Sequence, residues 1–103
     1  MDINRTTQAD GLIYHLRGRF DAHEVAKLKG TLEPVSQNFS LDMQGVNFID
    51  SSGLALLVSL YKKAREANVD MKICNLQDTV KVILEVTKLD MVLPLDNRQK
   101  VGS

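Results

Sequence analysis

The chain has 103 residues, of which 44% are hydrophobic and 25% are charged, and its 13 basic and 13 acidic side chains balance. This length favours one small globular domain over residues 1–103, and the neutral balance lacks the basic surface of a nucleic-acid binder. The longest apolar run, residues 54–60, is too short to cross a bilayer, so we expect no membrane insertion.

The first third of the chain predicts two strands and a helix. Residues 1–7 are expected to form an edge strand, and residues 11–17 alternate apolar and polar side chains as a half-buried strand does. Residues 22–33 have apolar side chains at helical spacing and end at a proline. Asp21 precedes them as an N-cap, with Glu24 placed as in a capping box.

The remaining residues continue the alternation of strands and helices. Residues 78–90 contain β-branched valines that suit a strand, but apolar spacing and Asp78 as an N-cap favour a helix. Residues 91–95 are expected to form a last short strand, which Pro94 would place at a sheet edge. The order β-β-α-β-α-β-α-β predicts a single α/β domain with a mixed, mostly parallel sheet. The other elements are expected over residues 39–43 with 46–49 (strand), 52–67 (helix) and 69–76 (strand).

The stretch FIDSSGLALL, residues 48–57, lies where a strand is expected to become a helix. Asp50 or Ser51 could simply accept hydrogen bonds from the free N–H groups of that helix. A hydroxyl at a helix N-terminus is also a favourable place for a phosphate, which would add about −1.5 to −2 charges to a docking surface. Gly53 permits close approach of another backbone, belonging either to a partner or to a neighbouring strand.

Other side chains give little sign of chemistry. Asp21, His23 and Ser51 make a poor hydrolytic triad, because the first two are neighbours at a helix start and no nucleophile elbow is present. The residues lack metal-site spacing and a phosphate-binding loop, so we expect no enzyme activity, metal or cofactor. His15 is expected to be a structural residue. Cys74 is expected to be a buried thiol, and one cysteine with a polar N-terminus favours the cytoplasm. Leu56 and Leu60 are expected to be core residues, although a partner could also cover them.

The segment LDMQGVNFIDSSGLALL closely resembles the signature of STAS domains, in particular of the bacterial anti-sigma-factor antagonists. LRGRFDAHEVAKLK is similar to their second strand and first helix, and VDMKICNLQDTVKVILEVTKLDMVLPL to the strand–helix–strand that follows. The resemblance covers residues 11–95 and leaves a polar tail, 96–103, where relatives usually add a helix. Ala55 stands where many relatives have a second glycine.

The resemblance implies an anti-sigma-factor antagonist that acts as a binding module. Its partner would be an anti-sigma factor that is also a GHKL-type serine kinase, which supplies the ATP and phosphorylates Ser51, with Ser52 as a secondary candidate. Phosphorylation would release the partner, and a PP2C-type phosphatase would reset the chain, which is expected to be a monomer or a weak dimer. The partner-binding residues implied are Asp21, Asp50, Ser51, Ser52, Gly53 and Leu54.

Two alternatives keep the fold and change the role. A phosphorylation-switched STAS protein can have a client other than a sigma factor. Some accessory subunits of lipid ABC transporters share GLALL after the motif, although they usually lack the double serine.

Overall fold

The computed structural model describes residues 2–9, 11–32 and 37–96. The strands are β1 (Asp2–Gln8), β2 (Gly11–Phe20), β3 (Phe39–Ile49) and β4 (Met71–Cys74). The helices are α1 (Ala22–Leu32), α2 (Ser51–Glu66) and α3 (Asp78–Val86), followed by a 3-10 turn, η1 (Leu89–Met91).

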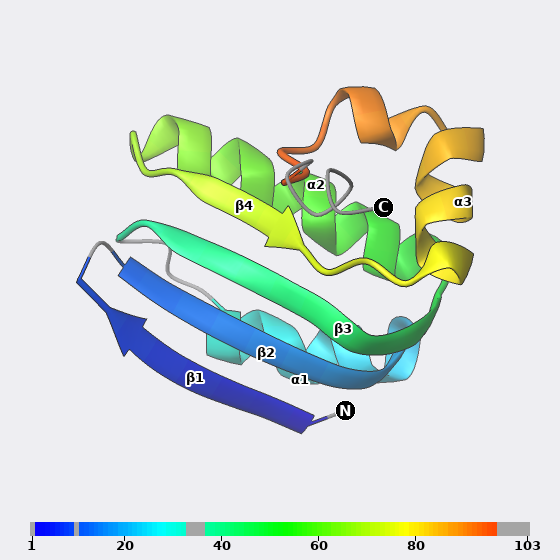
Figure 1. Cartoon of the computed structure of the whole chain (residues 1–103), viewed down its shortest axis with the longest axis horizontal. Coiled ribbons are helices and arrows are strands. Elements are labelled where there is room, and N and C mark those ends of the chain that lie inside the picture. The colour runs from blue at the N-terminus through cyan, green and yellow to red at the C-terminus, as the bar shows by residue number, and fades with distance from the viewer. Residues whose placement is uncertain (1, 10, 33–36, 97–103) are drawn as a thin grey trace.

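The four strands form one sheet in the order β1-β2-β3-β4. The edge strand β1 is antiparallel to β2, whereas β2 with β3 and β3 with β4 are parallel. Right-handed crossovers between strands that succeed one another in one direction place their helices on the same face of a sheet. Accordingly α1 and α2 run behind the sheet, its other face is open, and α3 lies at one end (Figure 1). The predicted mixed, mostly parallel sheet is confirmed.

The core lies between the sheet and the two crossover helices. Alternate residues of the central strands point toward the helices; Leu16 and Leu41, for example, are 2% and 0% exposed. Leu56 and Leu60 are 1% and 0% exposed, so the expectation that they are core residues is confirmed. No helix in the described part of the chain has the length and apolar character to span a bilayer.

Two local predictions are wrong. Residues 91–95 form no strand, because the chain makes the 3-10 turn η1 and then touches β4 through a single parallel bridge between Ile73 and Leu95. Pro94 accepts a hydrogen bond from Ile73 N–H at 3.0 Å but has no N–H of its own with which to continue a ladder. Helix α3 is confirmed, but its N-cap is Gln77, and Asp78 is its first residue.

Candidate functional site at the start of helix α2

Ser51 is the first residue of α2, and Asp50 alone separates it from the end of β3. Its side chain is exposed, whereas Ser52 is half-buried. Strand β3 ends at one end of the sheet. Helix α2 begins there and brings the following residues back against the core. Of the two neighbouring hydroxyls, Ser51 is therefore the one that another protein can reach more easily.

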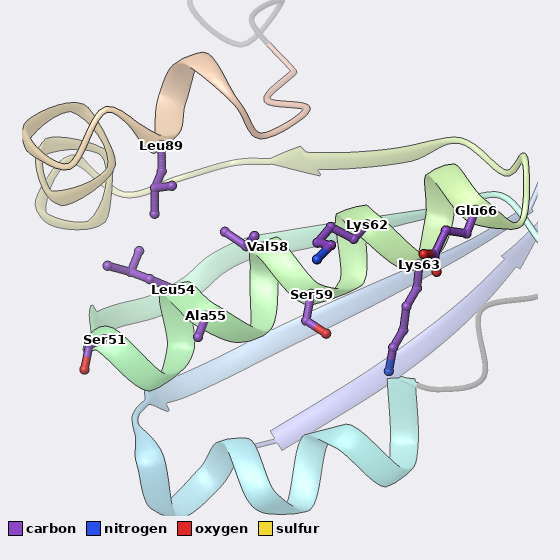
Figure 2. A pocket seen from close by; sticks show the side chains of 9 residues that line it. All are labelled: Ser51, Leu54, Ala55, Val58, Ser59, Lys62, Lys63, Glu66 and Leu89. Atoms are coloured by element: carbon purple, nitrogen blue, oxygen red, sulfur yellow. The ribbon is translucent and has the colours of Figure 1, made fainter.

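A groove of about 680 Å³ runs along the outer face of α2 (Figure 2). Ser51 stands at one end, and Lys62 and Lys63 stand toward the other. Between them lie the predicted contact residue Leu54 and, one helical turn further on, Val58. Leu54 is half-buried because its side chain also packs against the edge of the core. The groove thus joins the exposed serine to an apolar surface.

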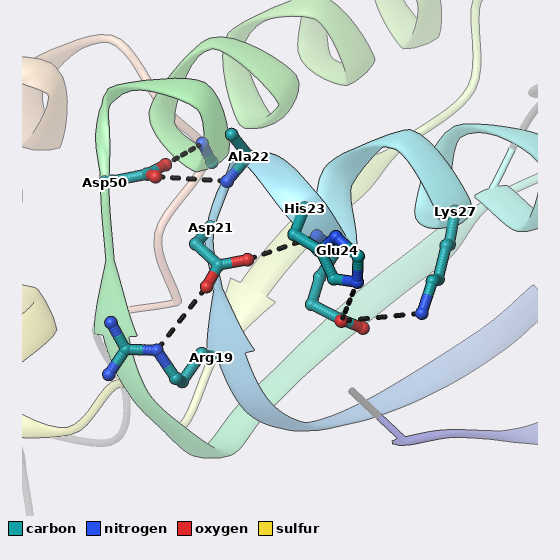
Figure 3. Close-up of polar contacts among 8 residues, drawn as sticks. Arg19, Asp21, Ala22, His23, Glu24, Lys27 and Asp50 are labelled. Carbon is teal, nitrogen blue, oxygen red and sulfur yellow. Dashed lines mark hydrogen bonds and ion pairs between the residues drawn. The ribbon is translucent and has the colours of Figure 1, made fainter.

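Asp50 connects the start of α2 to the start of α1 (Figure 3). Its Oδ1 accepts a hydrogen bond from Gly53 N–H at 3.0 Å, which confirms the predicted N-cap. Its Oδ2 accepts one from Ala22 N–H at 3.1 Å. Since β2 and β3 are parallel neighbours, the helices that follow them begin side by side, and one carboxylate serves both.

Asp21 caps α1, as predicted. Its Oδ1 accepts a hydrogen bond from Glu24 N–H at 3.1 Å, and its Oδ2 accepts one from Arg19 Nε at 3.4 Å (Figure 3). The bond from Glu24 N–H lowers the pKa of Asp21, with Arg19 adding to the effect against the opposing effect of burial. Arg19 in turn stacks on the ring of Phe48, 3.9 Å from its centre. Asp21 is adjacent in the chain to the residue that Asp50 binds, so the predicted site residues come together.

Gly53 is buried against the end of β2. A Cβ atom at this position would lie 2.5 Å from the carbonyl oxygen of Phe20 and 2.8 Å from Cγ1 of Ile49. Both distances are shorter than van der Waals contact allows. The close neighbour that the glycine accommodates is therefore the chain's own strand, which was one of the two alternatives.

A polar network crosses the open face of the sheet. His15 Nδ1 lies 2.8 Å from Asp42 Oδ2, and its Nε2 lies 3.1 Å from the hydroxyl of Thr6. Asp42 also accepts hydrogen bonds from Asn75 and from Gln44 N–H. Burial opposes ionisation of Asp42, but these hydrogen bonds outweigh it, so its pKa is lowered. Both ring nitrogens of His15 thus have hydrogen-bond partners, as expected of a satisfied residue.

Asp42 itself was not singled out in the sequence. The sequence does indicate that His15 and Asp42 lie on the outward side of their strands, because each follows the alternation of apolar and polar residues. Which strands are neighbours, and in which register, could not be read from that pattern.

The remaining sequence expectations have simple outcomes. His23 Nε2 lies 3.8 Å from Glu24 Oε2, and the carboxylate of Asp21 accepts hydrogen bonds from Glu24 N–H and Arg19 Nε. Cys74 was expected to be buried but is only half-buried. Its thiol lies 3.6 Å from the carbonyl oxygen of Leu41. Among the described residues, no three His, Cys, Asp or Glu side chains are grouped as metal ligands.

The fold and the site define a small α/β domain that presents an exposed serine at the start of its second helix, beside a groove. The chain belongs to the STAS domain family, whose model matches residues 2–100. It is 24% identical to the anti-sigma-B factor antagonist of Staphylococcus aureus over 98% of this chain and 99% of that protein.

Solved structures share the fold at low identity. The phosphorylated form of the Bacillus cell fate determinant SpoIIAA superposes with a TM-score of 0.69 at 14% identity, covering 97% of this chain and 96% of that one. A sulfate transporter family protein from Wolinella succinogenes has a TM-score of 0.70 at 21% identity, covering 81% and 73%. One fold therefore serves proteins of different roles, and the role of this chain must be argued from its site.

Proposed function

We propose that this chain is an anti-sigma-factor antagonist in a cytoplasmic partner-switching pathway. In its unphosphorylated form it binds an anti-sigma factor that is also a GHKL-type serine kinase, and phosphorylation of Ser51 ends the binding. A PP2C-type phosphatase restores the binding form. The observation that carries the proposal is the exposed hydroxyl of Ser51 at the start of α2, at the end of an apolar groove. The similarity over almost the whole length to a protein named an anti-sigma-B factor antagonist supports it.

The position of Ser51 suits a switch that changes binding and leaves the fold intact. The start of a helix carries partial positive charge, so a phosphate there is tolerated and does not melt the helix. The same phosphate adds about −1.5 to −2 charges beside Asp50 on the surface that a partner must cover. A hundredfold loss of affinity needs about 2.8 kcal/mol, and like charges facing each other in an interface cost several kcal/mol.

The other site residues have supporting parts in this proposal. Asp21 and Asp50 hold the two helix starts together, Leu54 offers apolar contact to the partner, and Gly53 lets α2 pack on β2. Ser52 is a secondary acceptor whose side chain is half-buried. The chain itself performs no catalysis and needs no cofactor, because the partner supplies both the ATP and the phosphoryl transfer. We expect a monomer or a weak dimer.

The direct test uses the serine kinase encoded beside this chain in its genome. Incubation with that kinase and ATP should add one phosphate, which mass spectrometry should locate on Ser51, and Ser52→Ala should be phosphorylated normally. Ser51→Ala should bind the kinase and resist release. Ser51→Asp should bind poorly, although one carboxylate imitates a dianion imperfectly. Binding of Ser51→Asp as tight as that of the native chain would refute the switch.

Copurification separates this proposal from its alternatives. Recovery of a GHKL-type kinase from the native host supports the antagonist. Recovery of an ABC ATPase would indicate a transporter subunit instead. A kinase complex that leaves every sigma factor unaffected would indicate a switch with another client.

A further inference from the structure

A cavity of about 500 Å³ lies between the edge strand β1 and helix α1, on the side of the sheet that the helices cover (Figure 1). Its apolar lining includes Ile3 of β1, which is half-buried, and Leu28 of α1, which is 1% exposed. Cavities of this volume are typical of sites for small molecules. The described residues that line this cavity are all different from those that line the groove on α2, so the two surfaces are separate.

The register of β1 against β2 brings Arg5 and Tyr14 together in this cavity. Arg5 lies directly opposite Tyr14 in the antiparallel pair, and both residues line the cavity. Opposite residues of such a pair have their side chains on the same face of the sheet, with Cβ atoms about 5 Å apart. The guanidinium of Arg5 therefore belongs to the same side of the sheet as the phenol of Tyr14.

Tyr14 has a buried hydroxyl group that lacks a partner. Its side chain is 7% exposed, and its ring packs edge-on against Phe39, with 6.2 Å between the ring centres. The hydroxyl makes no hydrogen bond with any residue in the described part of the chain. Buried hydroxyl groups normally have a hydrogen-bond partner, because burial without one is unfavourable. An acceptor atom bound in the cavity would satisfy this group.

The charged side chains that line the cavity indicate the charge of its ligand. Lys27 Nζ lies 3.7 Å from Glu24 Oε2, so the charge of this lysine is already paired (Figure 3). Arg5 is exposed and forms no ion pair with an acidic side chain of the described residues. One guanidinium matches one negative charge, and the carboxylate of Glu24 in the same cavity disfavours a dianion. A guanidinium binds a carboxylate through two parallel hydrogen bonds, which makes a carboxylate the best match.

We propose that this cavity binds a small monocarboxylate with an apolar body, such as a medium-chain fatty acid or an aryl carboxylate. Its carboxylate accepts hydrogen bonds from the guanidinium of Arg5 and from the hydroxyl of Tyr14. Its apolar body packs against Ile3 and Leu28. The proposal does not rest on the antagonist function, because none of these residues belongs to the site at the start of α2.

The first test titrates the isotope-labelled chain with sodium octanoate and follows the backbone amide signals by nuclear magnetic resonance. The signals of Ile3, Arg5 and Tyr14 should shift with saturation at about millimolar concentration or below, as expected for a ligand of this size, and those of Leu54 and Val58 should not. Acetate lacks the apolar body and octanol lacks the charge, so each should bind at least about tenfold more weakly than octanoate. Benzoate tests the aromatic form of the ligand, and saturable binding of either acid at these amides supports the site. Octanol that binds as tightly as octanoate would overturn it, and so would the absence of saturable shifts with both acids.

The second test assigns the contacts to particular side chains. Arg5→Gln should weaken octanoate binding by at least about tenfold, because it removes the charge that the carboxylate needs. The matched control is Arg17→Gln, the same substitution at an exposed position of the neighbouring strand, and it should bind octanoate within about twofold of the native chain. Binding by Arg5→Gln as tight as that of the control would overturn the proposal.

Tyr14→Phe tests the unpartnered hydroxyl with two measurements. It should weaken octanoate binding by about threefold to tenfold, because the ligand loses a donor. Without ligand it should melt at the same temperature as the native chain or higher, because the hydroxyl that it removes has no partner in the free protein. Octanoate should raise the Tm of the native chain, since it binds the folded form, and raise that of Arg5→Gln much less. A lower Tm of free Tyr14→Phe together with unchanged octanoate binding would show that the hydroxyl serves the fold and not a ligand.

Discussion

The same substitution, glycine to alanine, should have opposite effects at two positions of this chain. Gly53 lies in the first turn of α2 against the end of β2, whereas Gly30 lies in α1, where an added Cβ atom would meet no neighbouring atom within 4 Å. Alanine is favoured over glycine inside a helix by up to about 1 kcal/mol. At Gly30 this preference acts alone, so Gly30→Ala should raise the free energy of unfolding by about 0.5 to 1 kcal/mol.

At Gly53 the packing opposes the preference. The added methyl group would lie 2.5 Å from the carbonyl oxygen of Phe20, which is a backbone atom and cannot rotate away. Overpacking of this kind costs about 1 to 3 kcal/mol, and a rigid neighbour places the cost at the upper end. Subtracting the helical preference leaves a net destabilisation of about 2 kcal/mol. For a domain of this size that corresponds to a fall in Tm of roughly 10 °C.

Urea unfolding followed by circular dichroism at 222 nm measures both variants on one scale. The midpoint should move up for Gly30→Ala and down for Gly53→Ala, with unchanged slopes. A Gly53→Ala protein as stable as the native chain would show that α2 can move away from β2 without loss. The close packing assigned to this position would then be wrong.

Three further predictions use the same measurement. Asp50→Asn keeps the shape of the side chain but offers one carbonyl oxygen to two N–H donors, so it should lower the free energy of unfolding by about 1 kcal/mol. Asp50→Ala removes both acceptors and should lower it by about 2 kcal/mol. Equal losses for the two variants would contradict the double cap. Asp42 has a lowered pKa in the folded state, so its ionised form stabilises the fold at neutral pH and this contribution is lost as the pH falls. At pH 7 the free energy of unfolding of Asp42→Asn should therefore be lower than that of the native chain, and this difference in free energy should become smaller below about pH 4. A difference that stays constant down to pH 3 would refute this. Leu60→Ala should cost about 2 to 5 kcal/mol because Leu60 is 0% exposed. Val82→Ala, at a side chain that is 53% exposed, should change stability by less than about 0.5 kcal/mol, and similar losses at both positions would contradict the assigned core.

Elements whose signals are local could be predicted from the amino-acid sequence alone. The alternation in residues 11–17, the capping Asp21 and the apolar spacing after Ser52 each depend on neighbours within four residues, and each predicted the correct element. The last strand failed for the same reason. Residues 91–95 have strand-like side chains, but β4 meets them only at a single bridge after η1.

Contacts between residues far apart in the sequence became known from the folded structure. It joined Asp50 to Ala22 and His15 to Asp42, because the register of neighbouring strands depends on how the whole chain closes into a sheet. It assigned the glycine at position 53 to packing against Phe20, and it left the serine at position 51 exposed at the end of a groove. A local pattern states which side chains belong together along one element. The sides that face solvent or another element follow from packing among segments far apart in the sequence.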